Sequence, residues 1–291
     1  MELTHILFPI DFSEHCTAFA DYVGAMVRGT GARLTILHVM ECPPPWYSDA
    51  DATLLSSLVD LAIIREHRQE QLNSYLEHQF QGLAPLRLLA QGDPATEIVQ
   101  FAKREQVSIV AMPTRGCGVF RRMLLGSVTA KVLHDAPCPV WTSSHTEHAT
   151  QSRYPYRTVA CALELSERSE DTIRWAYQFA SQQNARLQVV HAIDVDEEST
   201  NQGVLEVRRY LCESASNKWQ NLETELGWTA PLHIAYGSVG AAVRKAVHDL
   251  QADIVIIGRG HAQEPLGHLR TSSYSIIRES PCPVISVLAP R

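Results

Sequence analysis

Glycine, arginine and serine gather in one segment, residues 113–128, which reads PTRGCGVFRRMLLGSV. Nine residues separate Gly116 from Gly126, and Ser127 follows at the predicted start of a helix. A helix N-terminus offers unpaired N–H groups and partial positive charge, and glycine lets the backbone approach an anion closely. The segment therefore suits a phosphate group. A tight turn closed by a serine cap has the same pattern, so the residues alone leave both interpretations open.

Two common phosphate motifs are absent from the chain. No GxxxxGK[ST] sequence occurs, which argues against a P-loop NTPase. Gly116 and Gly118 are followed by Arg121 instead of a third glycine, so the dinucleotide-binding fingerprint also fails. No nucleophile–base pair or pair of carboxylates stands out beside the segment, and we therefore predict no catalytic residues.

The chain repeats itself. Four segments of the first half recur in the same order in the second half: ILFPIDFSE as VACALELSE, ARLTILHVM as ARLQVVHAI, VSIVAMPTRG as ADIVIIGRGH, and DAPCPVW as ESPCPVI. A duplication explains this shared order, and internal repeats of this kind decide the fold. We predict a first domain at 1–145, a polar linker at 146–153 and a second domain at 154–291, with pseudo-twofold symmetry between the domains.

Apolar runs alternate with helical patterns in both copies. In the first copy the runs lie at 5–10, 34–39, 85–92, 107–113 and 137–143, with helices predicted at 13–29, 52–79, 93–102 and 127–133. Such alternation predicts an α/β fold, with a five-stranded, mostly parallel open sheet in each copy and helices on both faces. In these sheets ligands bind at the carboxyl ends of the strands.

Net charge, the length of the apolar runs and the spacing of the cysteines argue against several classes of protein. The net charge of −7 argues against nonspecific binding to nucleic acid or to an anionic membrane. No run of 18 apolar residues predicts a membrane span, and the first residues lack the pattern of a signal peptide, so we expect a cytoplasmic protein. The seven cysteines contain no CxxC pair, so neither a disulfide framework nor a zinc site is expected.

The combination of ILFPIDFSE, TILHV, a Gly-x9-Gly-Ser loop and a terminal APCPV segment resembles the universal stress protein family. The resemblance covers nearly the whole chain, once in each copy. It implies a Rossmann-like fold of the adenine-nucleotide alpha-hydrolase type and a stress-response protein that binds ATP or AMP, with or without Mg²⁺. Such a protein acts as a switch or interaction module, and at most hydrolyses ATP slowly.

The resemblance also implies where the nucleotide contacts this chain. Asp11 and Val39 would address the base and ribose, and the candidate residues of the loop region are Pro113, Arg115, Gly116, Gly126, Ser127 and Val128. The weaker counterparts in the second copy are Glu164, Ala192, Gly258, His261, Thr271 and Ser272. Pro113 replaces the first glycine of the family's pattern, and proline fixes φ and lacks an N–H. The second copy departs further, so we predict that the first copy is the binding half.

Several alternatives stay open at the level of sequence. The chain could be a nucleotide-free interaction module, or it could bind a different small molecule in the same cleft through Glu164, Arg259 and His261. Asp11 could simply form a turn, whereas His38 and His191 are more readily explained as packed core histidines. By resemblance the fifth strands of the two copies pair with each other. A homodimer or an unidentified protein partner is not readable from the residues.

Overall fold

The computed structural model describes residues 2–41, 54–114, 125–143, 154–166, 169–196, 198–259 and 271–288. For residues 54–61 and for Thr271 it describes the backbone alone. The predicted linker at 146–153 lies outside these ranges, as do Arg115, Gly116 and His261.

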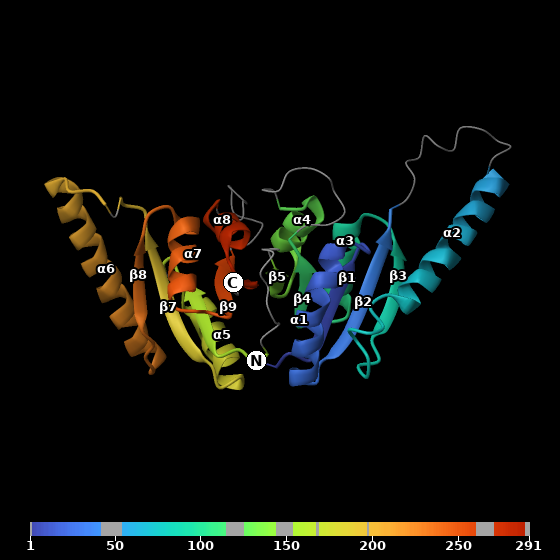
Figure 1. Ribbon diagram of the computed structural model, residues 1–291, viewed down its shortest axis with the longest axis horizontal. Coiled ribbons are helices and arrows are strands. Elements are labelled where there is room, and N and C mark those ends of the chain that lie inside the picture. The colour runs from blue at the N-terminus through green and yellow to red at the C-terminus, as the bar shows by residue number, and fades with distance from the viewer. Residues whose placement is uncertain are drawn as a thin grey trace.

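Strands and helices alternate through both copies, as the apolar runs predict (Figure 1). The first copy comprises β1 (His5–Ile10), α1 (Glu14–Thr30), β2 (Arg33–Met40), α2 (Leu54–Ser74), β3 (Leu86–Gln91), α3 (Pro94–Arg104), β4 (Ile109–Pro113), α4 (Ser127–Asp135) and β5 (Val140–Ser143). The second copy comprises β6 (Thr158–Ala162), α5 (Ser169–Gln182), β7 (Arg186–Ile193), α6 (Gln202–Leu226), β8 (Leu232–Tyr236), α7 (Val239–Asp249), β9 (Ile254–Arg259), α8 (Thr271–Glu279) and β10 (Val284–Leu288).

Polar capping residues mark the starts of α1 and α3. The Ser13 side chain accepts a hydrogen bond from the Cys16 amide at 3.3 Å and caps α1, as predicted. Asp93 caps α3 by accepting from the Thr96 amide at 2.9 Å, with Pro94 in the first turn. These polar caps satisfy N–H groups that a helix cannot pair internally.

Helix α2 ends at Ser74, earlier than the predicted end at residue 79. Two features account for this difference. Leu76 has a φ of 57°, which breaks the helical backbone. The Arg87 guanidinium of β3 donates to the carbonyls of Leu72 and Tyr75 at 2.7 and 2.6 Å. A side chain from the next strand therefore hydrogen-bonds the carbonyls at the end of the helix.

The ten strands within the described residues form one sheet in the order β3-β2-β1-β4-β5-β10-β9-β6-β7-β8. Pairing is parallel within each copy and antiparallel between β5 and β10. The order reads the same outward from this central pair in both directions, as the predicted pseudo-twofold symmetry requires. In each copy the chain first runs outward from β1 or β6 and then continues on the other side of that strand. This change of direction is where an open α/β sheet forms its ligand crevice.

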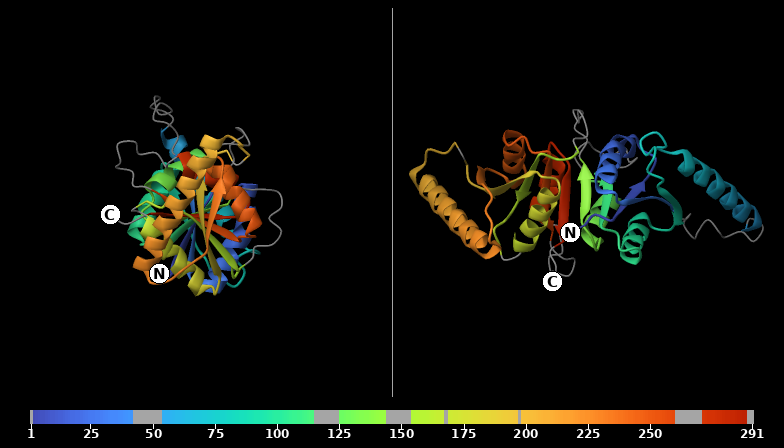
Figure 2. Two further views of the ribbon diagram at one scale, coloured as in Figure 1. Left: turned by 90° about the vertical axis from the view of Figure 1, so that its left-hand side faces the viewer. Right: turned by 90° about the horizontal axis from the view of Figure 1, so that it is seen from below.

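Helices cover both faces of the sheet (Figure 2). On one face, apolar side chains of α1, α2, α5 and α6 form a buried core that includes Phe19, Phe179 and Trp219. On the other face, α3, α4, α7 and α8 form a second core that includes Phe101 and Ile276. Each core contains residues of both copies, so the two copies share their interior.

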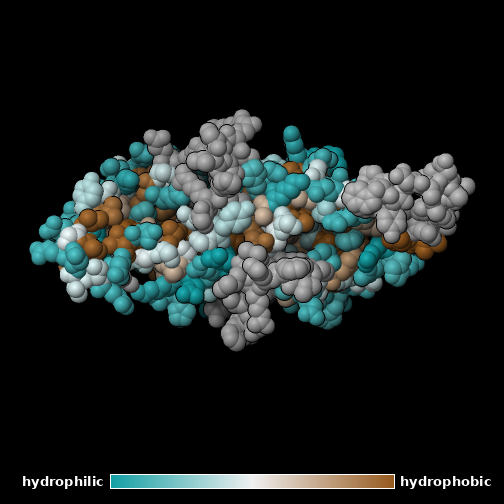
Figure 3. All heavy atoms as spheres, turned by 90° about the horizontal axis from the view of Figure 1, so that it is seen from above, coloured by the Kyte–Doolittle hydropathy of each residue, from teal (hydrophilic) through white to brown (hydrophobic). Residues whose placement is uncertain are grey.

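Exposed apolar side chains gather on the two outermost long helices. They include Ile63 and Ile64 of α2 and Leu205, Val207 and Tyr210 of α6. Seen from above, apolar surface is visible at the end of the molecule where α2 projects (Figure 3).

The predicted pairing of the fifth strands is confirmed. Residues Val140, Trp141 and Thr142 of β5 pair with β10 in antiparallel register. Side chains add to this ladder, because Thr142 Oγ1 donates to the Val284 carbonyl at 3.3 Å and Ser286 Oγ to the Val140 carbonyl at 3.2 Å. The pairing covers two strand edges that would otherwise expose unpaired backbone groups.

The indole of Trp141 lies at this junction and tests its contribution to stability. It is fully buried and meets the Phe19 ring edge-on at 4.8 Å between centroids. Trp141→Ala is expected to lower the free energy of unfolding by about 3–5 kcal/mol, since it leaves a cavity in the core. Urea unfolding followed by circular dichroism measures the change. Leu86→Ala, at a side chain that is 55% exposed, is the control and should change stability by about 0.5 kcal/mol or less. Equal effects of the two substitutions would contradict the assignment.

Candidate functional site

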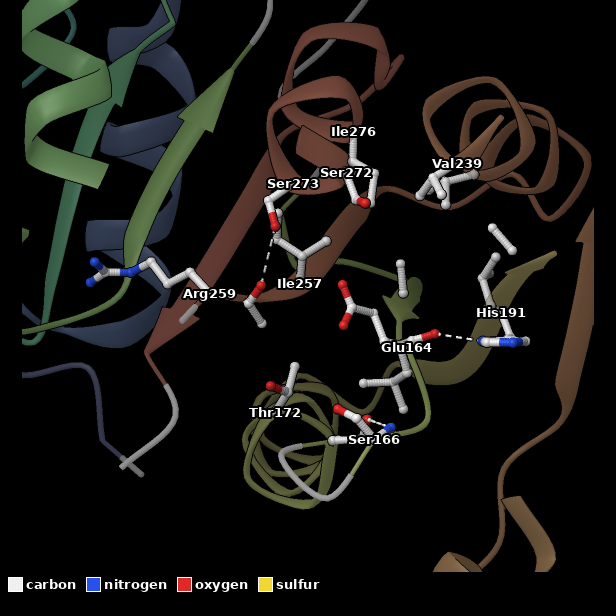
Figure 4. Close-up of a pocket in the computed structure, with 17 residues that line it drawn as sticks. Glu164, Ser166, Thr172, His191, Val239, Ile257, Arg259, Ser272, Ser273 and Ile276 are labelled. Atoms are coloured by element: carbon white, nitrogen blue, oxygen red, sulfur yellow. Dashed lines mark hydrogen bonds between the residues drawn. The ribbon is translucent and has the colours of Figure 1, made fainter. Parts of the chain in front are cut away.

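A cavity of about 340 Å³ opens in the second copy, at the carboxyl ends of β6, β7 and β9 (Figure 4). The first residues of α5, α7 and α8 close its other side, including Ser169, Val239 and Ser272. Its volume falls within the range of small-molecule pockets, and its position is the crevice expected for this fold.

The cavity combines an apolar wall with a few polar groups. The Glu164 side chain, which follows β6, extends into it (Figure 4). Hydroxyl groups come from Ser166, Ser169, Thr172, Ser272 and Ser273, and the apolar wall from Val190, Val243, Ile257 and Ile276. This mixture can hold a flat apolar ring and form hydrogen bonds with the hydroxyl groups of a ligand.

Four of the counterparts predicted in the second copy line this one cavity: Glu164, Ala192, Gly258 and Ser272. Gly258 is needed for packing, since a Cβ at this position would lie 2.6 Å from Thr172 Oγ1. Thr271 is the first residue of α8, and only its backbone is described. Sequence reasoning missed Thr172 and Ser273, because single hydroxyl residues inside a helix belong to no motif.

Arg259 does not serve the cavity in the way the sequence suggests. One alternative left open by the sequence makes Arg259 a polar determinant of the cleft together with Glu164, but the side chain points away from that carboxylate (Figure 4). Its guanidinium instead donates to main-chain carbonyls of the first copy. The expectation is therefore wrong for the guanidinium, because the end of β9 lies against the junction of the two copies.

In the first copy the structure brings the predicted residues to the corresponding strand ends. Asp11 follows β1, Val39 lies near the end of β2, and Pro113 ends β4. The Pro113 carbonyl accepts a hydrogen bond from Thr129 Oγ1 of α4 at 3.1 Å, which ties the end of β4 to that helix. Strand ends and the start of α4 therefore meet on one side of the sheet.

The start of α4 differs in one detail from the sequence interpretation. Gly126 is the N-cap, with φ −60° and ψ 143°, and its amide donates to the Thr114 carbonyl at 2.8 Å. Ser127 is therefore the first helical residue and not the cap. Val128 follows it in the first turn, where N–H groups have no partner within the helix.

Asp11 forms a turn, which is one of the two interpretations that the sequence leaves open. Its Oδ1 accepts from the Ser13 amide at 3.1 Å and from the Cys16 thiol at 3.2 Å. Burial, helped by the nearby Asp11 charge, raises the pKa of Cys16 to about 12. The carboxylate thus braces the start of α1, and a ligand role for it stays a proposal.

The two strand histidines are structural, as predicted. His38 Nδ1 donates to the Ile10 carbonyl at 2.9 Å, and His191 Nδ1 to the Leu163 carbonyl at 2.8 Å. Each imidazole ties its strand to the end of the neighbouring strand. Burial is the main cause that lowers the pKa of both side chains below the usual 6.5.

The described part of the chain contains neither a cluster of metal-binding side chains nor a membrane-spanning helix. No three His, Cys, Asp or Glu side chains within it come together as a metal site. None of its helices is long and apolar enough to span a membrane.

Comparison with known proteins gives consistent matches. A sequence model of the universal stress protein family matches residues 2–143 and 155–287. A universal stress protein of Thermus aquaticus is 31% identical over 137 residues, which are 46% of this chain and 94% of that protein. The crystal structure of a universal stress protein from Archaeoglobus fulgidus covers 100% of both chains, with a TM-score of 0.69 and 22% identity. The functionally unknown protein PA1789 of Pseudomonas aeruginosa covers 99% of this chain and 93% of its own, with a TM-score of 0.63 and 16% identity.

The buried histidines predict a pH dependence of stability. Because the pKa of each side chain is lower in the folded chain than in the unfolded chain, the unfolded chain takes up protons first as the pH falls through 6.5, so this stabilisation is present above that pH and is lost as the pH falls. We expect His38→Gln with His191→Gln to reduce the difference in urea midpoint between pH 7.5 and pH 5.5. His248→Gln, at a side chain that is 83% exposed, is the control. An unchanged difference in the double variant would refute this account.

Proposed function

Since the chain belongs to the universal stress protein family, we propose that it binds an adenine nucleotide, ATP or AMP, and acts as a switch or interaction module. The observation that carries the proposal is the meeting of strand carboxyl ends with helix N-termini in both copies, which forms a cavity in the second. This is the arrangement that binds nucleotides in open α/β sheets.

The residues of the cavity fit the nucleoside part of such a ligand. The Glu164 carboxylate can accept hydrogen bonds from ribose hydroxyl groups, and the side chains of Val190 and Ile257 can pack against a base. The volume of about 340 Å³ lies near the lower end for small-molecule pockets. The crevice at these strand ends therefore suits a nucleoside, and the residues available for the phosphates decide which copy binds a nucleotide.

The first copy is better equipped for the phosphates. Gly126 caps α4 without a Cβ, so a phosphate can approach the amides of Ser127 and Val128. The second copy has Thr271 at the equivalent position. Pro113 is accommodated as the last residue of β4, paired with Ser143 of β5, so its ring does not interrupt the strand. We therefore retain the first copy as the proposed nucleotide site.

A second candidate function is favoured by the location of the cavity. It lies in the copy whose loop lacks the Gly-Ser pair, and the side chain of Arg259 points away from it. The second copy could accordingly bind a small molecule other than a nucleotide.

Calorimetry with ATP and with AMP on nucleotide-stripped protein tests the proposal. We expect binding of about one equivalent per chain, weakened at least tenfold (~1.4 kcal/mol) by Gly126→Val, whose side chain would block the phosphate. The backbone at Gly126 is extended, so valine should not disturb the fold. Thr271→Val, at the equivalent position of the second copy, is the matched control and should bind normally.

Other outcomes are equally informative. Loss of binding in Thr271→Val alone would move the site to the second copy. Absence of heat with both nucleotides, and of nucleotide released from freshly purified protein by heating, would refute the proposal and favour a nucleotide-free interaction module.

A further inference from the structure

Arg259 reaches from the second copy into the first. It is the last residue of β9 and is only 3% exposed. Its Nη1 donates to the Leu133 carbonyl, and its Nη2 donates to the carbonyls of Ala136 and Cys138, each at 2.6 Å. These three acceptors form the end of α4 and the connection to β5.

The guanidinium supplies hydrogen-bond donors for main-chain carbonyls at the end of α4. The last carbonyls of a helix have no partner within it, and a cation there also interacts favourably with the helix dipole. Burial lowers the pKa of Arg259 to about 10, so the side chain remains charged at neutral pH. Hydrogen bonds from a charged donor are the stronger kind, which suits a fixed contact.

The two copies satisfy the main-chain carbonyls of this turn in different ways. At the position of Ala136 the second copy has Ser280, whose Oγ donates to the Cys282 carbonyl at 2.7 Å. At the position of Arg259 the first copy has Thr114, whose Oγ1 donates to the Ser143 carbonyl of its own copy at 3.0 Å. The second copy therefore caps this turn internally, whereas the first copy depends on an arginine from its neighbour.

We propose that Arg259 is a positioning residue through which the second copy holds helix α4 of the first copy. The helix has nine residues, so fixing its end also fixes its start at Gly126. Gly258, next to Arg259, lines the cavity of the second copy. The cavity and the proposed phosphate site thus lie at the two ends of one connected path, an extension that rests on the proposed function.

Hydrogen exchange measured by mass spectrometry tests the positioning role without any nucleotide. Arg259→Met removes the donors but keeps an unbranched apolar side chain. We expect amide exchange in α4 to become at least about threefold faster, with α8 as the internal control that stays unchanged. Arg259→Lys should have an intermediate effect, because one ammonium group cannot reproduce the planar fork.

Adding Ala136→Ser to Arg259→Met gives the first copy the internal cap of the second. We expect this double variant to recover part of the protection of α4. Equal acceleration in α4 and α8 in the single variant, or no change in α4, would overturn the proposal. If Arg259→Met does not fold, the lysine variant provides the same comparison of α4 with α8.

Nucleotide affinity provides the functional readout. In calorimetry Arg259→Met should weaken ATP binding about three- to tenfold, and Ala136→Ser should restore part of it. Unchanged affinity despite faster exchange in α4 would overturn the link to the phosphate site. If the unsubstituted protein binds no nucleotide, the proposed function fails, and the exchange experiment still decides whether Arg259 positions α4.

Discussion

The antiparallel pairing of β5 with β10 is the contact on which the rest of the architecture depends. It joins two five-stranded parallel sheets into one and lets both apolar cores continue from one copy to the other. It also brings the end of β9 close enough to α4 for a side chain of one copy to reach the main chain of the other. This junction therefore holds the two copies together and also allows a side chain of one copy to contact the other.

Much of the fold could be predicted from the sequence because its signals are local. Apolar runs mark the strands, and Ser13 and Asp93 mark helix starts. The repeat of His38 as His191 correctly indicates equivalent core positions. The early end of α2 could not be predicted, because it depends on Arg87 of β3, a strand that follows α2 in the sequence.

The candidate site was predicted less completely for the same reason. The strand ends that meet there follow from the order of elements, but the side chains that line the cavity come from helices as well. The direction of Arg259 is decided by carbonyls more than a hundred residues earlier in the chain. No local pattern encodes such a contact, so residue type and position alone left a ligand role for Arg259 open.

Because the two copies belong to one chain, the residues at their junction can differ between the copies. In a dimer of identical chains every substitution appears twice, and an arginine at the position of Arg259 would bury two guanidinium groups at the junction. A tandem chain can bury one and keep Thr114 at the related position. Its halves also meet at a fixed effective concentration, so dilution cannot separate them. The duplication therefore permits an asymmetric junction that independent, identical subunits could not maintain.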